Sequence, residues 1–188
     1  MYSDYQKKLQ LFFASIKHLS ILFLFFVLFA GIVSFAQQRK EGSNTGADSV
    51  LTARREMIHK RSSLVMPFNM NKVTHYFIKT DNGGILRIIS KSGDDPKQVK
   101  LIREHLHKEQ HLFSAGDFRD PKTLHGINMP GLKILTKSND KYRVLYKEIR
   151  NGAQLSFTSE DTTVVNALHT WFAAQLRDHG SDARSHEK

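Results

Sequence analysis

The stretch VTHYFIKTDNGGILRIIS, residues Val73 to Ser90, decides the fold of this chain. Its two ends, residues 73–79 and 85–90, are rich in β-branched and aromatic residues, which favour strands. Between them lies DNGG (residues 81–84), and its Asn-Gly pair is the strongest short-range signal for a β-hairpin. The stretch therefore predicts two antiparallel strands joined by a tight turn.

A helix is predicted directly after this hairpin. Asp95 followed by Pro96 is typical of a helix start, because an aspartate caps the first turn and proline suits the first helical position. Apolar residues then recur at helical spacing as far as Phe113, and Gly116 follows the end. These signals predict a helix over residues 96–115.

The same order of elements returns in the second half of the chain. YRVLYKEI (142–149) and AQLSFT (153–158) are predicted strands on either side of Asn151-Gly152. Asp161 then caps a second helix with an apolar stripe, which runs to His179 and is followed by Gly180. A weak internal duplication is one explanation, and chance similarity is the other.

The pattern β-β-α-β-β-α predicts an α+β fold: a four-stranded antiparallel sheet with two helices on one face. Two helices cover one face of a sheet only. The other face would keep apolar side chains exposed, which favours a homodimer or a lid formed by residues 114–132.

The N-terminus has the features of an export signal. Lys7, Lys8 and Lys17 precede an apolar run over residues 19–33, and Ser34 and Ala36 are the small residues expected at a cleavage site after Ala36. The alternative is an uncleaved membrane anchor over residues 11–36. Both readings predict an exported protein, either periplasmic or secreted or held at the membrane.

The remaining chain divides into three parts. Residues 37–65 are polar at the start and poor in apolar periodicity, which predicts a flexible linker. The alternative for residues 50–60 is a short helix, although their apolar positions form a poor stripe. Residues 66–183 predict a single α+β domain, and residues 184–188 predict a polar tail.

Composition excludes several classes of function. The chain has no cysteine, so disulfides, cysteine-ligated zinc and thiol catalysis are excluded. No phosphate-binding glycine loop, dinucleotide fingerprint or G-x-S-x-G motif is present, so nucleotide chemistry and the serine hydrolases that use that motif are not expected. The net charge of +10 suits an anionic surface or nucleic acid, but the basic residues form no dense cluster.

Glu109 is the least expected residue of the first helix. At 100° per residue it falls inside the apolar stripe, where a carboxylate is costly unless it is paired. His105 lies one turn earlier, at the spacing where two helical side chains converge on one ligand. We expect Glu109 to contact His105, His125 or a basic side chain. The alternatives are a structural salt bridge and a boundary glutamate that reaches solvent.

Further candidates lie in the long segment between the two halves and on the other elements. SAGDFRDPKTLHGINMPGL (114–132) is too long for a plain connector, and such loops often carry function. Its candidates are Asp117, His125 and Met129, and the alternative is that its apolar residues plug the open end of the core. His75 on the first strand and His169 on the second helix are candidates whose alternative role is purely structural.

The principal candidate site is therefore a set of nitrogen and oxygen donors: His75, His105, Glu109 and His125, with Asp117, Met129 and His169 as secondary members. Such a set suits a divalent transition metal, Zn, Ni or Cu. No established metal-binding spacing is present. The pair His107 and His111 has the right spacing, but it points away from the apolar stripe and is expected to face solvent.

Several motifs are similar to a family of small bacterial proteins that often carry signal peptides and have no established function. The resemblance covers residues 66–183 and rests on MPF (66–68), KVTHYF (72–77), LIREHL (101–106), GDF (116–118), HG (125–126), MPGL (129–132), NGA (151–153), HTWF (169–172) and DHG (178–180). Some members are labelled aspartate carbamoyltransferase. The chain does not support that label, because it lacks the Ser-Thr-Arg-Thr-type carbamoyl phosphate motif and is much smaller than that enzyme.

Three functions follow as hypotheses. The leading one is an exported, non-catalytic binding or interaction module, homodimeric through the open sheet face. The second is a metal-binding or metal-dependent hydrolytic protein that uses the His/Glu set. The third is binding to an anionic surface or to nucleic acid, which rests on net charge alone.

Overall fold

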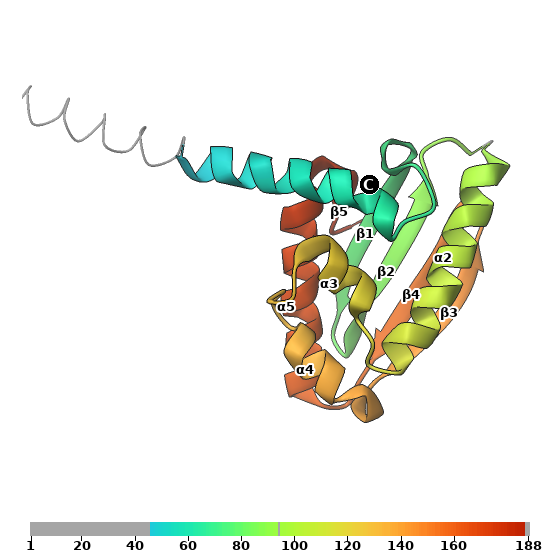
Figure 1. Ribbon diagram of the computed structural model, residues 1–188. Coiled ribbons are helices and arrows are strands. Elements are labelled where there is room, and N and C mark those ends of the chain that lie inside the picture. Colours follow the sequence, from blue (N-terminus) through green and yellow to red (C-terminus); the bar gives the residue numbers. More distant parts are fainter. Residues whose placement is uncertain (1–45, 94, 187–188) are drawn as a thin grey trace, which may run out of the picture. The chain divides into compact units, whose positions relative to one another are not determined.

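The computed structural model describes residues 46–93 and 95–186, so the expected export signal at residues 1–36 lies outside the described residues. Leu51–Lys188 form one compact unit, and its architecture is α+β, as the sequence predicts (Figure 1). Among the described residues, no helix is both long enough and apolar enough to cross a bilayer.

The sheet has the strand order β3-β4-β2-β1-β5. Its elements are β1 (Val73–Thr80), β2 (Gly83–Ser90), β3 (Arg143–Ile149), β4 (Gly152–Thr158) and β5 (Ala183–Arg184). The four predicted strands pair antiparallel, but β5 adds a parallel pair at the free edge of β1. The prediction of a four-stranded, wholly antiparallel sheet is therefore wrong by one strand, and the expected polar tail begins inside β5. An edge strand has unpaired backbone groups, and this short pairing covers some of them.

Both hairpins turn one residue earlier than the Asn-Gly pairs suggest. Gly83 pairs with Thr80, and Gly152 pairs with Ile149, so each glycine begins a strand. A Cβ on Gly83 would lie 2.0 Å from a backbone oxygen of β4, and a Cβ on Gly152 would lie 2.0 Å from the carbonyl oxygen of Ile88. The glycines therefore permit the close approach of β2 and β4.

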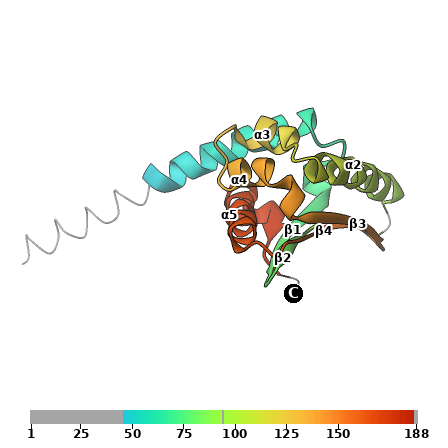
Figure 2. The ribbon, with the colours of Figure 1, turned by 90° about the horizontal axis from the view of Figure 1, so that it is seen from below.

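The two long helices form where the sequence predicts them. They are α2 (Pro96–Ser114) and α5 (Thr162–His179). The Asp95 carboxylate accepts from the backbone N–H of Gln98 at 3.2 Å, and Asp161 caps α5 in the same way. In Figure 2 the helices lie together on one side of the sheet, and the core fills the space between the two layers.

Two short helices stand in and just beyond the segment expected to be an irregular loop. They are α3 (Arg119–His125) and α4 (Leu132–Lys137), so the prediction of only two helices is wrong. Each is too short to show helical periodicity, and both are fixed by buried apolar residues, among them Leu124 and Leu132. Residues 51–61, part of the expected flexible linker, are helical as well, with Ile58 buried in the compact unit.

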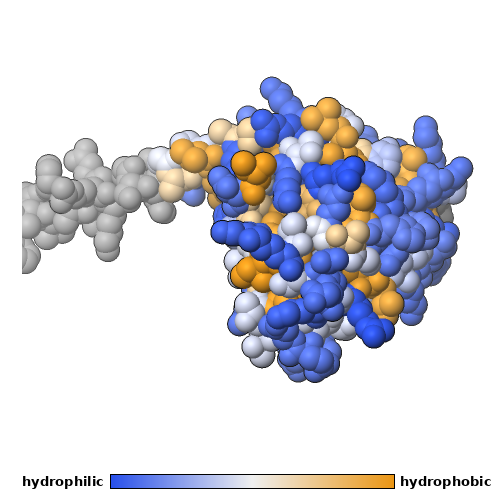
Figure 3. All heavy atoms as spheres, turned by 60° about the horizontal axis from the view of Figure 1, so that its bottom comes forward, coloured by the Kyte–Doolittle hydropathy of each residue, from blue (hydrophilic) through white to orange (hydrophobic). Residues whose placement is uncertain are grey.

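The face of the sheet away from the helices keeps apolar residues. Tyr76 and Ile78 alternate with the inward-facing His75 and Phe77 and are partly exposed, and Leu145 is 63% exposed. Figure 3 looks at the lower end and the helix side of the molecule, not at this face, and there hydrophobic side chains form separate patches among hydrophilic ones. The homodimer stays a prediction.

Candidate functional site

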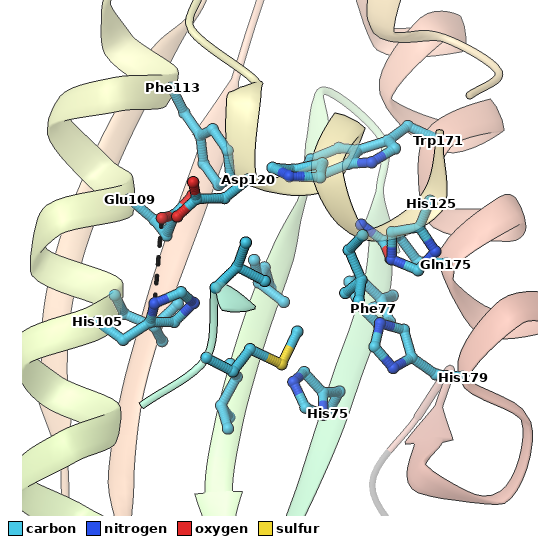
Figure 4. A pocket seen from close by; sticks show the side chains of 17 residues that line it. His75, Phe77, His105, Glu109, Phe113, Asp120, His125, Trp171, Gln175 and His179 are labelled. Atoms are coloured by element: carbon cyan, nitrogen blue, oxygen red, sulfur yellow. Dashed lines mark ion pairs between the residues drawn. The ribbon is translucent and has the colours of Figure 1, made fainter. Parts of the chain in front are cut away.

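A largely apolar cavity with two groups of polar side chains lies between the sheet and helices α2, α3 and α5 (Figure 4). Its volume is about 40 Å³, room for roughly three water molecules. Figure 4 shows two polar ends, one beside α2 and one beside α5. We call the group His105, Glu109 and Asp120 the carboxylate end, and the group His75, His125 and His179 the imidazole end.

The carboxylate end brings together side chains from two helices. His105 and Glu109 are one turn apart on α2, and Asp120 comes from the first turn of α3. One ligand atom from each residue lies within 4.8 Å of the other two. Glu109 is only 2% exposed, and its Oε1 lies 4.0 Å from His105 Nδ1. Glu109 therefore lies beside His105, one of the partners expected for it, at a distance longer than a hydrogen bond.

Burial and charge shift the pKa values of the two carboxyl groups at this end in opposite directions. Burial raises the pKa of Glu109 to about 8, and the neighbouring Asp120 carboxylate adds to the shift. Burial alone would raise the pKa of Asp120, but hydrogen bonds from Glu109 and Lys108 outweigh it and lower that pKa. At neutral pH Glu109 is thus mostly protonated and Asp120 is ionised, as expected of two carboxyl groups in one site.

Two basic groups complete the surroundings of these carboxyl groups. Lys108 Nζ lies 2.6 Å from Asp120 Oδ2 and 3.8 Å from Glu109 Oε1, and its side chain is 54% exposed. Burial lowers the pKa of His105 to about 4. The His105 imidazole is therefore neutral at pH 7, which is the form that can ligate a metal.

The imidazole end is organised around a buried carboxylate. Asp178 Oδ2 lies 3.0 Å from His125 Nδ1, and Arg54 donates to Asp178 from Nε at 2.8 Å and from Nη2 at 2.6 Å. Burial alone would raise the pKa of Asp178, but the bonds with Arg54 and His125 hold it well below its usual range. An ionised Asp178 fixes the His125 ring with its Nδ1–H toward the carboxylate, which leaves Nε2 as the free nitrogen.

The other two imidazoles pack against this pair. The rings of His75 and His179 stack with centroids 4.8 Å apart, and His179 meets His125 edge to face at 5.1 Å. Burial lowers the pKa of His75 to about 3, reinforced by His105 and His125 and weakly opposed by the Asp182 backbone. Burial also holds the pKa of His179 well below its usual range. Both rings are neutral at physiological pH.

Polar atoms without hydrogen-bond partners concentrate in this cavity. Seven buried side-chain atoms make no hydrogen bond to the described residues, and six of the seven belong to cavity-lining residues: His75 Nδ1 and Nε2, Glu109 Oε1, His125 Nε2, Trp171 Nε1 and Gln175 Oε1. Each such atom is costly when left unpaired. Their concentration in one place is typical of a binding site rather than of a packed core.

The four principal candidates from the sequence, His75, His105, Glu109 and His125, all line the cavity. The three secondary candidates do not. Asp117 pairs with Arg119 and Met129 belongs to the hydrophobic core. The third, His169, donates from Nε2 to the carbonyl oxygens of Thr80 and Gly83 at 3.0 and 2.8 Å and so ties α5 to the first hairpin. His107 and His111 are exposed, as expected.

Sequence reasoning missed Asp120, Asp178, His179, Arg54, Trp171 and Gln175. For α5 a signal was present, because Trp171, Gln175 and His179 are spaced by four residues and share one helical face. No such sequence signal marks Asp120 or Arg54, because each lies in a segment without clear helical periodicity.

Comparison with known proteins does not identify this chain by similarity: no protein-family model matches it, and no curated protein or solved structure is significantly similar. The function is therefore argued from the cavity itself.

Proposed function

We propose that the protein binds a divalent transition metal through His105, Glu109 and Asp120. The observation that carries the proposal is the Glu109 carboxyl group, which is buried, has an unpaired Oε1 and faces two other possible ligands. A buried carboxylate is normally paired, and a cation would let both acidic groups ionise together. Of the four ligands in the metal hypothesis of the sequence, this site keeps His105 and Glu109 and adds Asp120. His75 and His125 lie at the imidazole end and are not part of it.

The donor set favours Zn²⁺ among the common metals. One imidazole nitrogen and two carboxylate oxygens suit Zn²⁺. Three protein ligands leave a coordination position free, and in this cavity that position would face the imidazole end. Metal binding also fits the exported compartment that the sequence predicts.

The competing explanation is a structural ion-pair network in which Lys108 neutralises both carboxyl groups. Titration of the metal-free, full-length protein with Zn²⁺ against a chelating indicator separates the two. We expect a single Zn²⁺ site that His105→Ala removes. The double variant His107→Ala/His111→Ala is the matched control, because that pair has the same i,i+4 spacing on the exposed face of the same helix. Binding that disappears in the control instead would contradict the proposal.

The metal site and the structural network predict different effects of a substitution at Lys108 on Zn²⁺ affinity. In a metal site its ammonium group repels the cation, so Lys108→Gln is expected to tighten Zn²⁺ binding on the order of tenfold. In a structural network the same change removes a useful cation and creates no site. The same indicator titration measures the effect, with Lys100→Gln on the exposed side of α2 as the control. Unchanged or weaker affinity in Lys108→Gln would count against the metal.

A further inference from the structure

We propose that the imidazole end of the cavity binds a small neutral molecule that both donates and accepts hydrogen bonds, of the primary amide class. The inference goes beyond the proposed metal and does not require it, because it rests on a different set of side chains. Three observations support it: the kinds of unpaired atom, the engagement of the nearby charges with one another and the size of the space.

Outside the carboxylate end, the unpaired atoms that line the cavity form a mixed set of donors and acceptors. The indole Nε1–H of Trp171 can only donate, and Gln175 Oε1 can only accept. The neutral tautomer of His125 that directs Nδ1–H at Asp178 presents Nε2 as an acceptor, and a neutral His75 offers one donor and one acceptor. A carbonyl oxygen satisfies the donors, and an amide NH₂ group satisfies the acceptors. A carboxylate has no hydrogen to offer to Gln175 or His125.

The permanent charges nearest this end are engaged with one another. Arg54 binds the Asp178 carboxylate through two hydrogen bonds, Arg177 lies 3.5 Å from the same carboxylate, and burial keeps His75 and His179 neutral by lowering the pKa of each ring. An anion would enter a largely apolar space in which both arginines already serve Asp178, which is costly. A neutral ligand avoids that cost.

The space restricts the ligand to a few atoms. A cavity of about 40 Å³ holds roughly three waters, so formamide, with about three non-hydrogen atoms, is the matched probe. A ligand of that size binds weakly even in a good site, and we expect a dissociation constant in the millimolar range. If the metal is bound at the carboxylate end, its free coordination position and the carbonyl group of the bound amide would lie in the same cavity.

The test uses formamide and formate, which have nearly the same shape but differ in charge. Trp171 is the only tryptophan of the chain, so its indole N–H gives a single, unambiguous signal in a ¹⁵N–¹H spectrum of the full-length, metal-free protein. We expect formamide to move this signal with saturation in the millimolar range, and formate at pH 7.5 to bind at least tenfold more weakly.

Variants locate the effect. Gln175→Leu removes one acceptor from the imidazole end and is expected to weaken formamide binding at least fivefold. Ser90→Ala is the control, because Ser90 Oγ is the one buried side-chain atom of residues 46–93 and 95–186 that makes no hydrogen bond and lies outside the cavity, and it should leave the binding unchanged. No saturable shift with formamide would mean that the space holds water only. Preference for formate would mean an anion site. Either result overturns the inference. The metal-binding proposal is tested independently, by the Zn²⁺ titration.

Discussion

Glu109→Gln is expected to weaken Zn²⁺ binding by on the order of a hundredfold or more. The change keeps the size of the side chain but replaces a carboxylate ligand with an amide, and even groups behind the ligands typically alter affinity 10–100-fold. Zn²⁺ must also displace the Glu109 proton, so the affinity of the parent protein should rise with pH up to about 8. The glutamine variant should lose most of this dependence. Equal affinities in parent and variant would remove Glu109 from the site.

The same substitution is expected to stabilise the metal-free protein at high pH. The folded-state pKa of Glu109 is about 8, above the ordinary value of 4.5, so the native state holds a proton that the unfolded chain has already lost. Stability therefore falls as pH rises from about 4.5 through 8. Glutamine mimics the protonated form at every pH. Urea unfolding should show the variant more stable by on the order of 1–3 kcal/mol at pH 8.5, and nearly equal to the parent at pH 5.

Loss of stability in the variant at pH 8.5 would contradict this account. It would mean that Glu109 is ionised and held by Lys108, as in a structural ion pair. Unfolding must be measured with a chelator present, because bound metal would stabilise the parent protein.

Asp178→Asn is expected to cost about 3–5 kcal/mol of folding free energy. The carboxylate is fully buried and accepts hydrogen bonds from Arg54 while holding His125. Removing one partner of a buried pair leaves the other charge uncompensated, and costs of this size are typical. The folded-state pKa of Asp178 is depressed, so its contribution is present above the ordinary pKa of about 3.8 and is lost only as pH falls below it.

Denaturant unfolding of Asp178→Asn between pH 6 and 8 measures this cost. Asp182→Asn is the matched control, because Asp182 pairs with Lys91 at 3.4 Å near the surface and should change stability by less than about 1 kcal/mol. If both variants lose the same small amount, Asp178 does not organise the imidazole end.

The sequence predicts the elements whose signals are local. The Val73–Ser90 stretch contains a hairpin, and Asp95 and Asp161 begin the two long helices. Glu109 could also be recognised, because a carboxylate inside an apolar stripe conflicts with the helical pattern. His105 then follows from the spacing of four residues.

The parts that the sequence could not predict depend on contacts between distant segments. Arg54 and Asp178 are 124 residues apart, and nothing near either position indicates the other. β5 is only two residues long, too short for any alternation to be visible. Asp120 lies on a helix of seven residues, where the fold and not the local pattern decides which side chains turn inward.

One consequence is that the site extends into the expected linker. Arg54 lies among the helical residues 51–61, and it reaches both Asp178 and the backbone carbonyl of His125 at 3.1 Å. The segment that connects the domain to the N-terminus therefore helps to fix the ring of His125 at the cavity.

The most direct measurement is an anomalous difference map at the zinc edge from crystals of the Zn²⁺-loaded protein. The account predicts one strong peak between α2 and α3, with His105 nitrogen and carboxylate oxygens of Glu109 and Asp120 at about 2.0–2.2 Å. A peak on the exposed His107 and His111, or no peak at the carboxylate end at full zinc occupancy, would contradict the proposed metal site.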